Sequence, residues 1–173
     1  NNLIEHLLSF SRSAADRYVK EDISVLVENT VTLMASKLKK KDIHLEFNHT
    51  GNKFVEMNLE SINIILVNLI ENAIDSFADD TNENTITLDI LAEESALKII
   101  VADNGCGIPS NNLESIFEPF YTTKDIDHGS GLGLYLVYNE VKKYNGDIAV
   151  ESTVGVGTKF NIFIDFERVE YEN

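Results

Sequence analysis

The segment from 59 to 77 constrains the fold most, because it is apolar almost all round a predicted helix. A helix that is apolar on every side must be buried, against a sheet or other helices. Asn68, Asn72 and Asp75 nevertheless recur at steps of four and three and form one polar stripe. A buried amide without a partner costs about 1–3 kcal/mol, so the stripe predicts a polar partner. That partner is either a neighbouring strand or a bound nucleotide with its metal ion, and the helix alone favours neither.

The patterns on either side of this helix mix helix and strand periodicity. Helical patterns cover 24–40 and 131–144, and Asn58 is a suitable N-cap for the central helix. Strand patterns cover 43–47, 53–56, 86–90, 97–102, 147–152 and 158–166, and the last two predict a hairpin. Because no strict strand–helix–strand rhythm appears, we expect an α+β fold: a two-layer sandwich with the helices on one face of one sheet.

Residues 1–19 are predicted to form a separate helix that enters this domain. Its apolar residues recur at spacings of four, three and four, namely Leu3, Leu7, Phe10 and Ala14. This is the seam of a coiled coil, although an amphipathic helix packed on its own domain fits equally well. We therefore expect an entry helix at 1–19 and a domain at 20–173.

Composition narrows the class of protein. The net charge of −15 argues against nucleic acid, whose phosphates are held by clustered Lys and Arg. No apolar run approaches the roughly 20 residues of a membrane helix, and Cys106, as the single cysteine, excludes an intrachain disulfide. The chain starts at Asn1 within a helical pattern, so we expect a cytoplasmic fragment of a longer protein, which could itself be membrane-anchored.

Two glycine-containing motifs are candidates for ligand binding. Asp103-Asn104-Gly105-Cys106-Gly107-Ile108-Pro109 follows the predicted strand 97–102. A carboxylate there can accept from the exocyclic amine of a purine, and the glycines allow the backbone to approach a flat ring. A tight turn explains the same pattern, and guanine carries such an amine too.

The second motif, Gly129-Ser130-Gly131-Leu132-Gly133-Leu134, opens a predicted helix. Free backbone N–H groups at a helix N-terminus suit phosphate, and a flexible hinge is the competing interpretation. No strand precedes these glycines and no Lys-Ser/Thr pair ends them, which excludes a dinucleotide fingerprint and a P-loop. Gly155-Val156-Gly157-Thr158 is explained most simply by a hairpin turn.

In this order and spacing, the motifs resemble the ATP-binding boxes of histidine kinases of the GHKL superfamily. Asn68 to Ala73 resembles the N box, and the two glycine motifs resemble the two glycine boxes. Phe117 to Lys124 is similar to the F box in the form typical of the nitrogen-regulation and dicarboxylate-sensor branch. The resemblance covers about 22–166 and implies the Bergerat fold. Residues 1–19 resemble the end of the second helix of a dimerisation hairpin.

The resemblance implies a catalytic domain that binds ATP and Mg²⁺. Asn72 would ligate Mg²⁺, Asp103 and Thr158 would bind the adenine, and Lys124 would contact phosphate. The implied nucleotide contacts are Asn68, Asn72, Asp103, Gly105, Gly107, Ile108, Thr123, Lys124, Gly129, Gly131, Leu132, Gly133, Leu134 and Thr158. The implied partners are the protein's own dimerisation domain, in a homodimer, and the receiver domain of a response regulator.

Two features depart from the family pattern. Many members carry Lys or Arg where this chain has Asp75, which would repel phosphate. The phosphate-accepting His, followed by an acid and then a Pro, is absent, since none of His6, His44, His49 and His128 fits it. We therefore expect the fragment to bind ATP without phosphorylating itself.

Three other functions remain open. Hydrolytic ATPases of the gyrase or heat-shock type carry a Glu one turn before the magnesium asparagine, where this chain has Asn68. Glu71 directly precedes the magnesium asparagine Asn72, and on a helix it points about 100° away from it. An anti-sigma-factor-like serine kinase has similar boxes, although the entry helix argues against it. A non-catalytic binding module would have no affinity for nucleotides.

Overall fold

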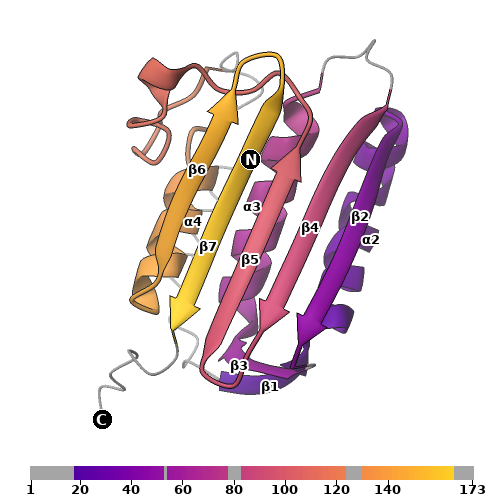
Figure 1. Ribbon diagram of the computed structural model, residues 1–173, viewed down its shortest axis with the longest axis vertical. Helices are drawn as coiled ribbons and strands as arrows, with labels where there is room; N and C mark the ends of the chain where they lie inside the picture. The colour runs from indigo at the N-terminus through magenta and orange to yellow at the C-terminus, as the bar shows by residue number, and fades with distance from the viewer. Residues whose placement is uncertain (1–17, 53, 78–82, 124–129, 166–173) are drawn as a thin grey trace.

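The computed structural model describes residues 18–52, 54–77, 83–123 and 130–165, and these form two layers. Five strands make one mixed sheet in the order β2 (Ile43–Gly51), β4 (Asn84–Ala92), β5 (Ala96–Asp103), β7 (Gly157–Asp165) and β6 (Asp147–Thr153). Three helices lie behind it, α2 (Ile23–Lys40), α3 (Leu59–Asp75) and α4 (Gly133–Lys143) (Figure 1). The α+β sandwich with its helices on one face is confirmed.

A separate antiparallel ribbon lies at one end of the sandwich. It consists of β1 (Tyr18–Asp22) and β3 (Phe54–Asn58), and Figure 1 shows it at the lower end of the sheet. The loop that follows β5 lies at the opposite end and contains a short 3₁₀ turn at Ser110–Asn112. The sandwich thus has one end bounded by the ribbon and another formed by loops.

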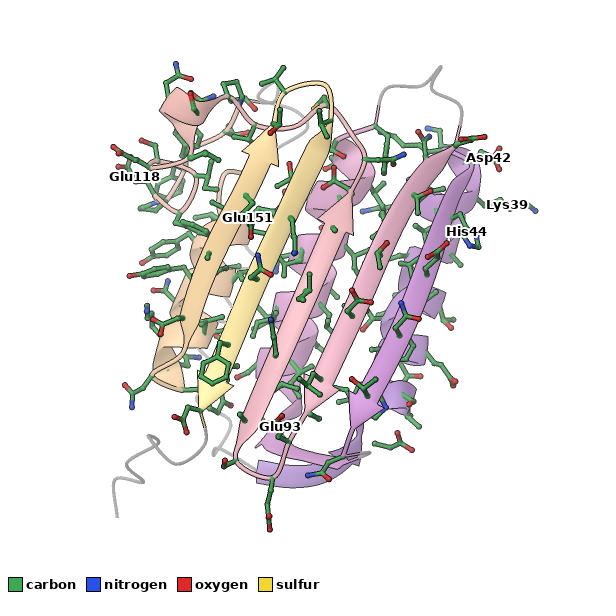
Figure 2. The ribbon with its side chains drawn as sticks, in the orientation of Figure 1. Lys39, Asp42, His44, Glu93, Glu118 and Glu151 are labelled. Carbon is green, nitrogen blue, oxygen red and sulfur yellow. The ribbon has the colours of Figure 1, made fainter. Side chains whose placement is uncertain are left out.

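The core lies between the sheet and the three helices, with α3 contributing the most deeply buried residues. Along α3 the large side chains that are at most 1% exposed are Ile62, Ile65, Leu66, Leu69 and Ile70. Residues of β4 and β5 alternate between this core and the open face of the sheet, as period-two strands require. Figure 2 shows Glu151 of β6 on the open face, which the helices do not cover. Burial of apolar area on one side only therefore explains the alternating pattern in the sequence.

Both long helices begin where a side chain can cap them. The Asn58 side chain accepts from the N–H of Glu60 at 2.8 Å, which confirms this residue as the N-cap of α3. Asp22 caps α2 in the same way, accepting from the N–H of Ser24 at 3.0 Å. Each cap satisfies an N–H group that has no partner within its helix.

Some predicted boundaries were wrong. α4 begins at Gly133 rather than near 131, because Gly131 has a φ of 65° and lies in the left-handed region. α3 ends at Asp75 rather than 77, and β2 continues to Gly51 because it pairs in parallel with all of β4. Tyr18 and Val19 belong to β1, so the predicted entry helix cannot include them.

Residues 1–17, which carry the predicted coiled-coil seam, lie outside the described residues, so an entry helix that ends before Tyr18 stays a prediction. Among the helices that the structure describes, none combines the length and apolar composition needed to cross a bilayer.

Candidate functional site

The Asp103 loop is held between the C-terminal end of α3 and the β6–β7 hairpin. Asp103 is the last residue of β5 and lies opposite Thr158 of β7. The N–H of Cys106 donates to the carbonyl of Ser76 at 3.0 Å. The carbonyl of Cys106 accepts from the N–H of Gly155 at 2.9 Å. Two backbone bonds thus fix the position of this loop on both sides.

The Asp103 carboxylate is partly buried and oriented by neighbouring donors. Its Oδ1 accepts from the N–H of Gly105 at 2.9 Å and lies 3.0 Å from the Ser76 hydroxyl, which shares its one proton between this oxygen and the carbonyl of Ala73 at 2.7 Å. Burial raises the pKa of this carboxyl above its ordinary value of 3.8, while the bonds from Gly105, Ser76 and the backbone of Thr158 act in the opposite direction. A carboxyl with a raised pKa in a loop region is a candidate for ligand binding.

Thr158 belongs to a second set of hydrogen bonds beside Asp103. The Ser152 hydroxyl accepts from the N–H of Ile108 at 2.7 Å and donates to the carbonyl of Gly157 at 3.0 Å. Thr158 Oγ1 lies 2.9 Å from Ser152 Oγ. Because the one Ser152 hydroxyl proton points to Gly157, Thr158 must be the donor in this pair. Thr158 Oγ1 then keeps its lone pairs, and the residue is only 4% exposed.

The glycines of the loop are required by the protein itself. A Cβ on Gly105 would lie 1.9 Å from Ser76 Oγ, and one on Gly107 would lie 2.2 Å from the carbonyl oxygen of Thr153. Gly107 also has a φ of 71°. Chain packing therefore explains why both are glycine, and their predicted role in leaving room for a ring stays a prediction.

The second half of the site lies where α3 meets the N-terminus of α4. The Asn68 amide donates to the carbonyl of Ile64 at 2.7 Å, so its Oδ1 is the group that lies near Gly133. A Cβ on Gly133 would approach this Oδ1 to 2.9 Å. Leu132 precedes α4 without a side-chain cap. Gly133 at the N-terminus of α4 and the Asn68 amide oxygen therefore lie side by side.

Asn72 lies one turn after Asn68 on α3 and is half-buried. The backbone carbonyl of Asn72 accepts from the N–H of Ser76 at 3.1 Å. Asn68, Asn72 and Ser76 follow one another at steps of four, so one face of α3 connects the α4 junction to the Asp103 loop.

The predicted F box leads from the Asp103 loop to α4. The Phe117 ring packs at 5.8 Å from that of Tyr138 and at 6.5 Å from that of Phe160. The N–H of Phe120 donates to the carbonyl of Gly131 at 2.9 Å, which ties this segment to the entrance of α4.

For the remaining predicted nucleotide contacts, the structure gives only their exposure. Thr123 is exposed, Leu132 is buried and Leu134 is half-buried. Lys124 and Gly129 lie outside the described residues.

Three residues of the site region had no sequence signal. Ser76 is a hydrogen-bond partner of Asp103, and Ser152 is a hydrogen-bond partner of Thr158. Lys41 donates to the carbonyls of Ile74 and Phe77 at 3.2 and 2.8 Å and so caps the C-terminal end of α3. Ser76 follows Asn72 by four residues, but this spacing predicts a site residue only once α3 is known to end at Asp75.

Comparison with known proteins identifies the family. Residues 57–168 match the model of the histidine kinase-, DNA gyrase B- and HSP90-like ATPase family. The chain is 35% identical over 176 residues to the sensor kinase CckA of Brucella abortus, covering 94% of this chain and 18% of that protein. It is 30% identical over 175 residues to the probable C4-dicarboxylate sensor kinase of Bacillus subtilis, covering 96% of this chain and 32% of that protein. The chain thus spans at most about a third of these two relatives.

Solved structures agree in fold. The catalytic domain of the histidine kinase ThkA, in a nucleotide-free form, has a TM-score of 0.74 at 26% identity, over 86% of this chain and 95% of that one. Full-length ShkA, solved in complex with AMPPNP, has a TM-score of 0.76 at 24% identity, over 94% of this chain and 35% of that one. The family match covers more than half of the chain and includes Asn68, Asp103 and Gly133. The chain therefore belongs to the histidine kinase-, DNA gyrase B- and HSP90-like ATPase family and is a histidine kinase ATP-binding domain.

Proposed function

We propose that this chain binds ATP with Mg²⁺ and transfers the γ-phosphate to a histidine that lies outside it, in a longer sensor kinase. The observation that carries the proposal is that one face of α3 connects Asp103 to the N-terminus of α4. Ser76 contacts Asp103, and Asn68 lies beside Gly133. Eight residues of helix separate Asn68 from Ser76, or about 12 Å, which suits a purine at one end and phosphates at the other.

At the base end, Asp103 would accept from the exocyclic amine of adenine. Ser76 and Gly105 both donate to Oδ1, so they hold the carboxylate in one orientation. Thr158 would accept beside it, since its own proton is directed to Ser152. An amine donor between two acceptors favours adenine over a base with a carbonyl at that position.

We expect the affinity for ATP to fall on acidification, and the fall to begin at a higher pH than the titration of an ordinary aspartate would give. Only the ionised Asp103 is a full acceptor for the amine, and burial raises its pKa above 3.8, so protonation begins earlier as the pH falls. Titrations of ATP at a series of pH values would measure this. Asp103→Asn should remove the part of the pH dependence that belongs to this carboxyl, and an identical profile in the variant would contradict the assignment.

At the phosphate end, the first N–H groups of α4 would bind the triphosphate, since a helix N-terminus favours anions. The residues present also fit Mg²⁺, because the amide oxygens of Asn68 and Asn72 are hard ligands from one helix face, and Mg²⁺ takes few protein ligands beside phosphate oxygens. Bound Mg²⁺ would neutralise phosphate charge. Lys124 and Gly129 are proposed to contribute from the segment before α4.

Within the N box, which the structure describes in full, the chain contributes positioning rather than a base. Glu71, the carboxylate within the N box, forms an ion pair with Lys37 of α2. Phosphoryl transfer depends mainly on positioning and charge neutralisation, so such a site can transfer phosphate to a presented histidine without activating water.

We therefore expect negligible steady-state ATP hydrolysis by this chain, together with measurable ATP binding. The two measurements are a calorimetric titration with ATP, with and without Mg²⁺, and a phosphate-release assay. Heat of binding that depends on Mg²⁺, without multiple turnovers, would support the kinase domain. Robust turnover would instead favour a hydrolytic ATPase, and the absence of binding would favour a non-catalytic module.

The remaining proposals concern the longer protein. The residues before β1, which begins at Tyr18, are proposed to end a dimerisation hairpin, and the residues from β1 onward to form the catalytic domain. The proposed partners are a second copy of the protein and the receiver domain of a response regulator. The domain is proposed to lie in the cytoplasm.

A further inference from the structure

A buried polar cluster joins α3 to α4 at the end away from Asp103, and the proposed function uses none of it. Its members are Ser61 of α3, Glu140 of α4 and Tyr144 directly after α4, which are 4%, 3% and 3% exposed. Polar groups are seldom buried this completely without a partner, because the loss of water costs free energy. The cluster therefore has to be satisfied internally.

The hydrogen bonds of the cluster run in one direction. The N–H of Asn58 donates to the Tyr144 hydroxyl at 3.2 Å, and that hydroxyl donates to Ser61 Oγ at 3.3 Å. Ser61 Oγ donates to Glu140 Oε2 at 2.8 Å. Lys143 donates to Glu140 Oε1 at 2.7 Å. The Glu140 carboxylate, at which this series of hydrogen bonds ends, polarises the Ser61 and Tyr144 hydroxyls and so strengthens the directional bonds.

The cluster lies at a definite spacing from the phosphate end. Asn68 follows Ser61 by seven residues on α3, and Glu140 follows Gly133 by seven residues on α4. The two helices run in opposite directions, since Gly133 lies beside Asn68 and Glu140 lies beside Ser61. Seven residues are about two helical turns. Any sliding of α4 along α3 would therefore break the polar cluster and displace Gly133 from Asn68 together.

We propose that Ser61, Glu140 and Tyr144 are positioning residues that fix the register of α4 on α3 and so place the N-terminus of α4 for the triphosphate. The inference rests on the proposed function, because it assumes that this N-terminus binds phosphate. Apolar contacts between the helices are non-directional and tolerate sliding, whereas the cluster is satisfied in one register only.

The test separates the phosphate end from the base end. In Ser61→Ala we expect the affinity for ATP with Mg²⁺ to fall about three- to tenfold, the range of one lost hydrogen bond. The affinity for adenosine should stay within about twofold of wild type, because Asp103 and its partners are untouched. Titrations followed by NMR measure both ligands, and the Gly133 amide should shift in the free variant.

The matched control is Ser36→Ala, which removes an exposed hydroxyl from α2 and should leave both affinities unchanged. Tyr144→Phe is the second variant and should give the same ATP-specific loss. Equal losses of affinity for ATP and adenosine, or no loss of affinity in either variant, would overturn the inference. The proposed function would still stand in that case if the wild type binds ATP. Wild-type protein that binds neither ligand would overturn the proposed function and this inference with it.

Discussion

Asp103→Asn is expected to lower the affinity for ATP roughly 100-fold, because the side chain would present a donor to the amine of adenine. Ser76 and the N–H of Gly105 both donate to Oδ1 of Asp103. These two donors would hold the amide oxygen of the variant in the same place, so its NH₂ group would take the position of Oδ2. A donor facing a donor loses the charge-assisted bond and adds repulsion.

Calorimetric titration with ATP and Mg²⁺ measures the effect of Asp103→Asn. Asp89→Asn is the matched control, since Asp89 of β4 lies on the open face of the sheet and pairs with Asn48. Its affinity for ATP should equal that of wild type. A purine riboside triphosphate, which lacks the exocyclic amine, should bind wild type and Asp103→Asn about equally. An unchanged affinity of Asp103→Asn for ATP would contradict the assignment of Asp103 to the base.

The layer arrangement could be predicted because apolar residues recur in the sequence with the period of a helix or of a strand. An all-round apolar helix at 59–77 has to lie in the core, and α3 does so. Alternation in 86–90 predicts a strand buried on one side, and β4 has this pattern. The N-cap at Asn58 was predictable as well, since capping depends on the residue itself and its immediate neighbours.

The boundaries and the supporting contacts of the site could not be predicted. The start of α4 depends on the left-handed backbone of Gly131, whose carbonyl accepts from Phe120 eleven residues earlier. Ser76 contacts Asp103 across 27 positions of sequence, and Lys41 reaches Phe77 across 36. No periodic pattern reports such contacts, because they depend on how separate elements pack rather than on local propensity.

Gly107→Ala is expected to destabilise the protein by about 2–4 kcal/mol, the largest stability effect that we predict. The φ of 71° at Gly107 disfavours any residue with a Cβ. The added Cβ would also lie 2.2 Å from the carbonyl oxygen of Thr153 and 3.0 Å from the Cα of Val154. These are backbone atoms of the β6–β7 hairpin, so relief requires the hairpin to move away from the loop. We expect a fall in the melting temperature of about 4–16 °C.

Gly155→Ala separates the two causes, because Gly155 has nearly the same φ, 76°, and no atom within 4 Å of an added Cβ. This variant should lose only about 1 kcal/mol, from backbone strain alone. The difference between the two variants in denaturant unfolding measures the contact between the Asp103 loop and the hairpin. Since that hairpin carries Thr158, Gly107→Ala should weaken ATP binding in its folded fraction, whereas Gly155→Ala should not. Equal destabilisation by both variants would mean that the hairpin yields freely, and the rigid placement of Thr158 beside Asp103 would then be wrong.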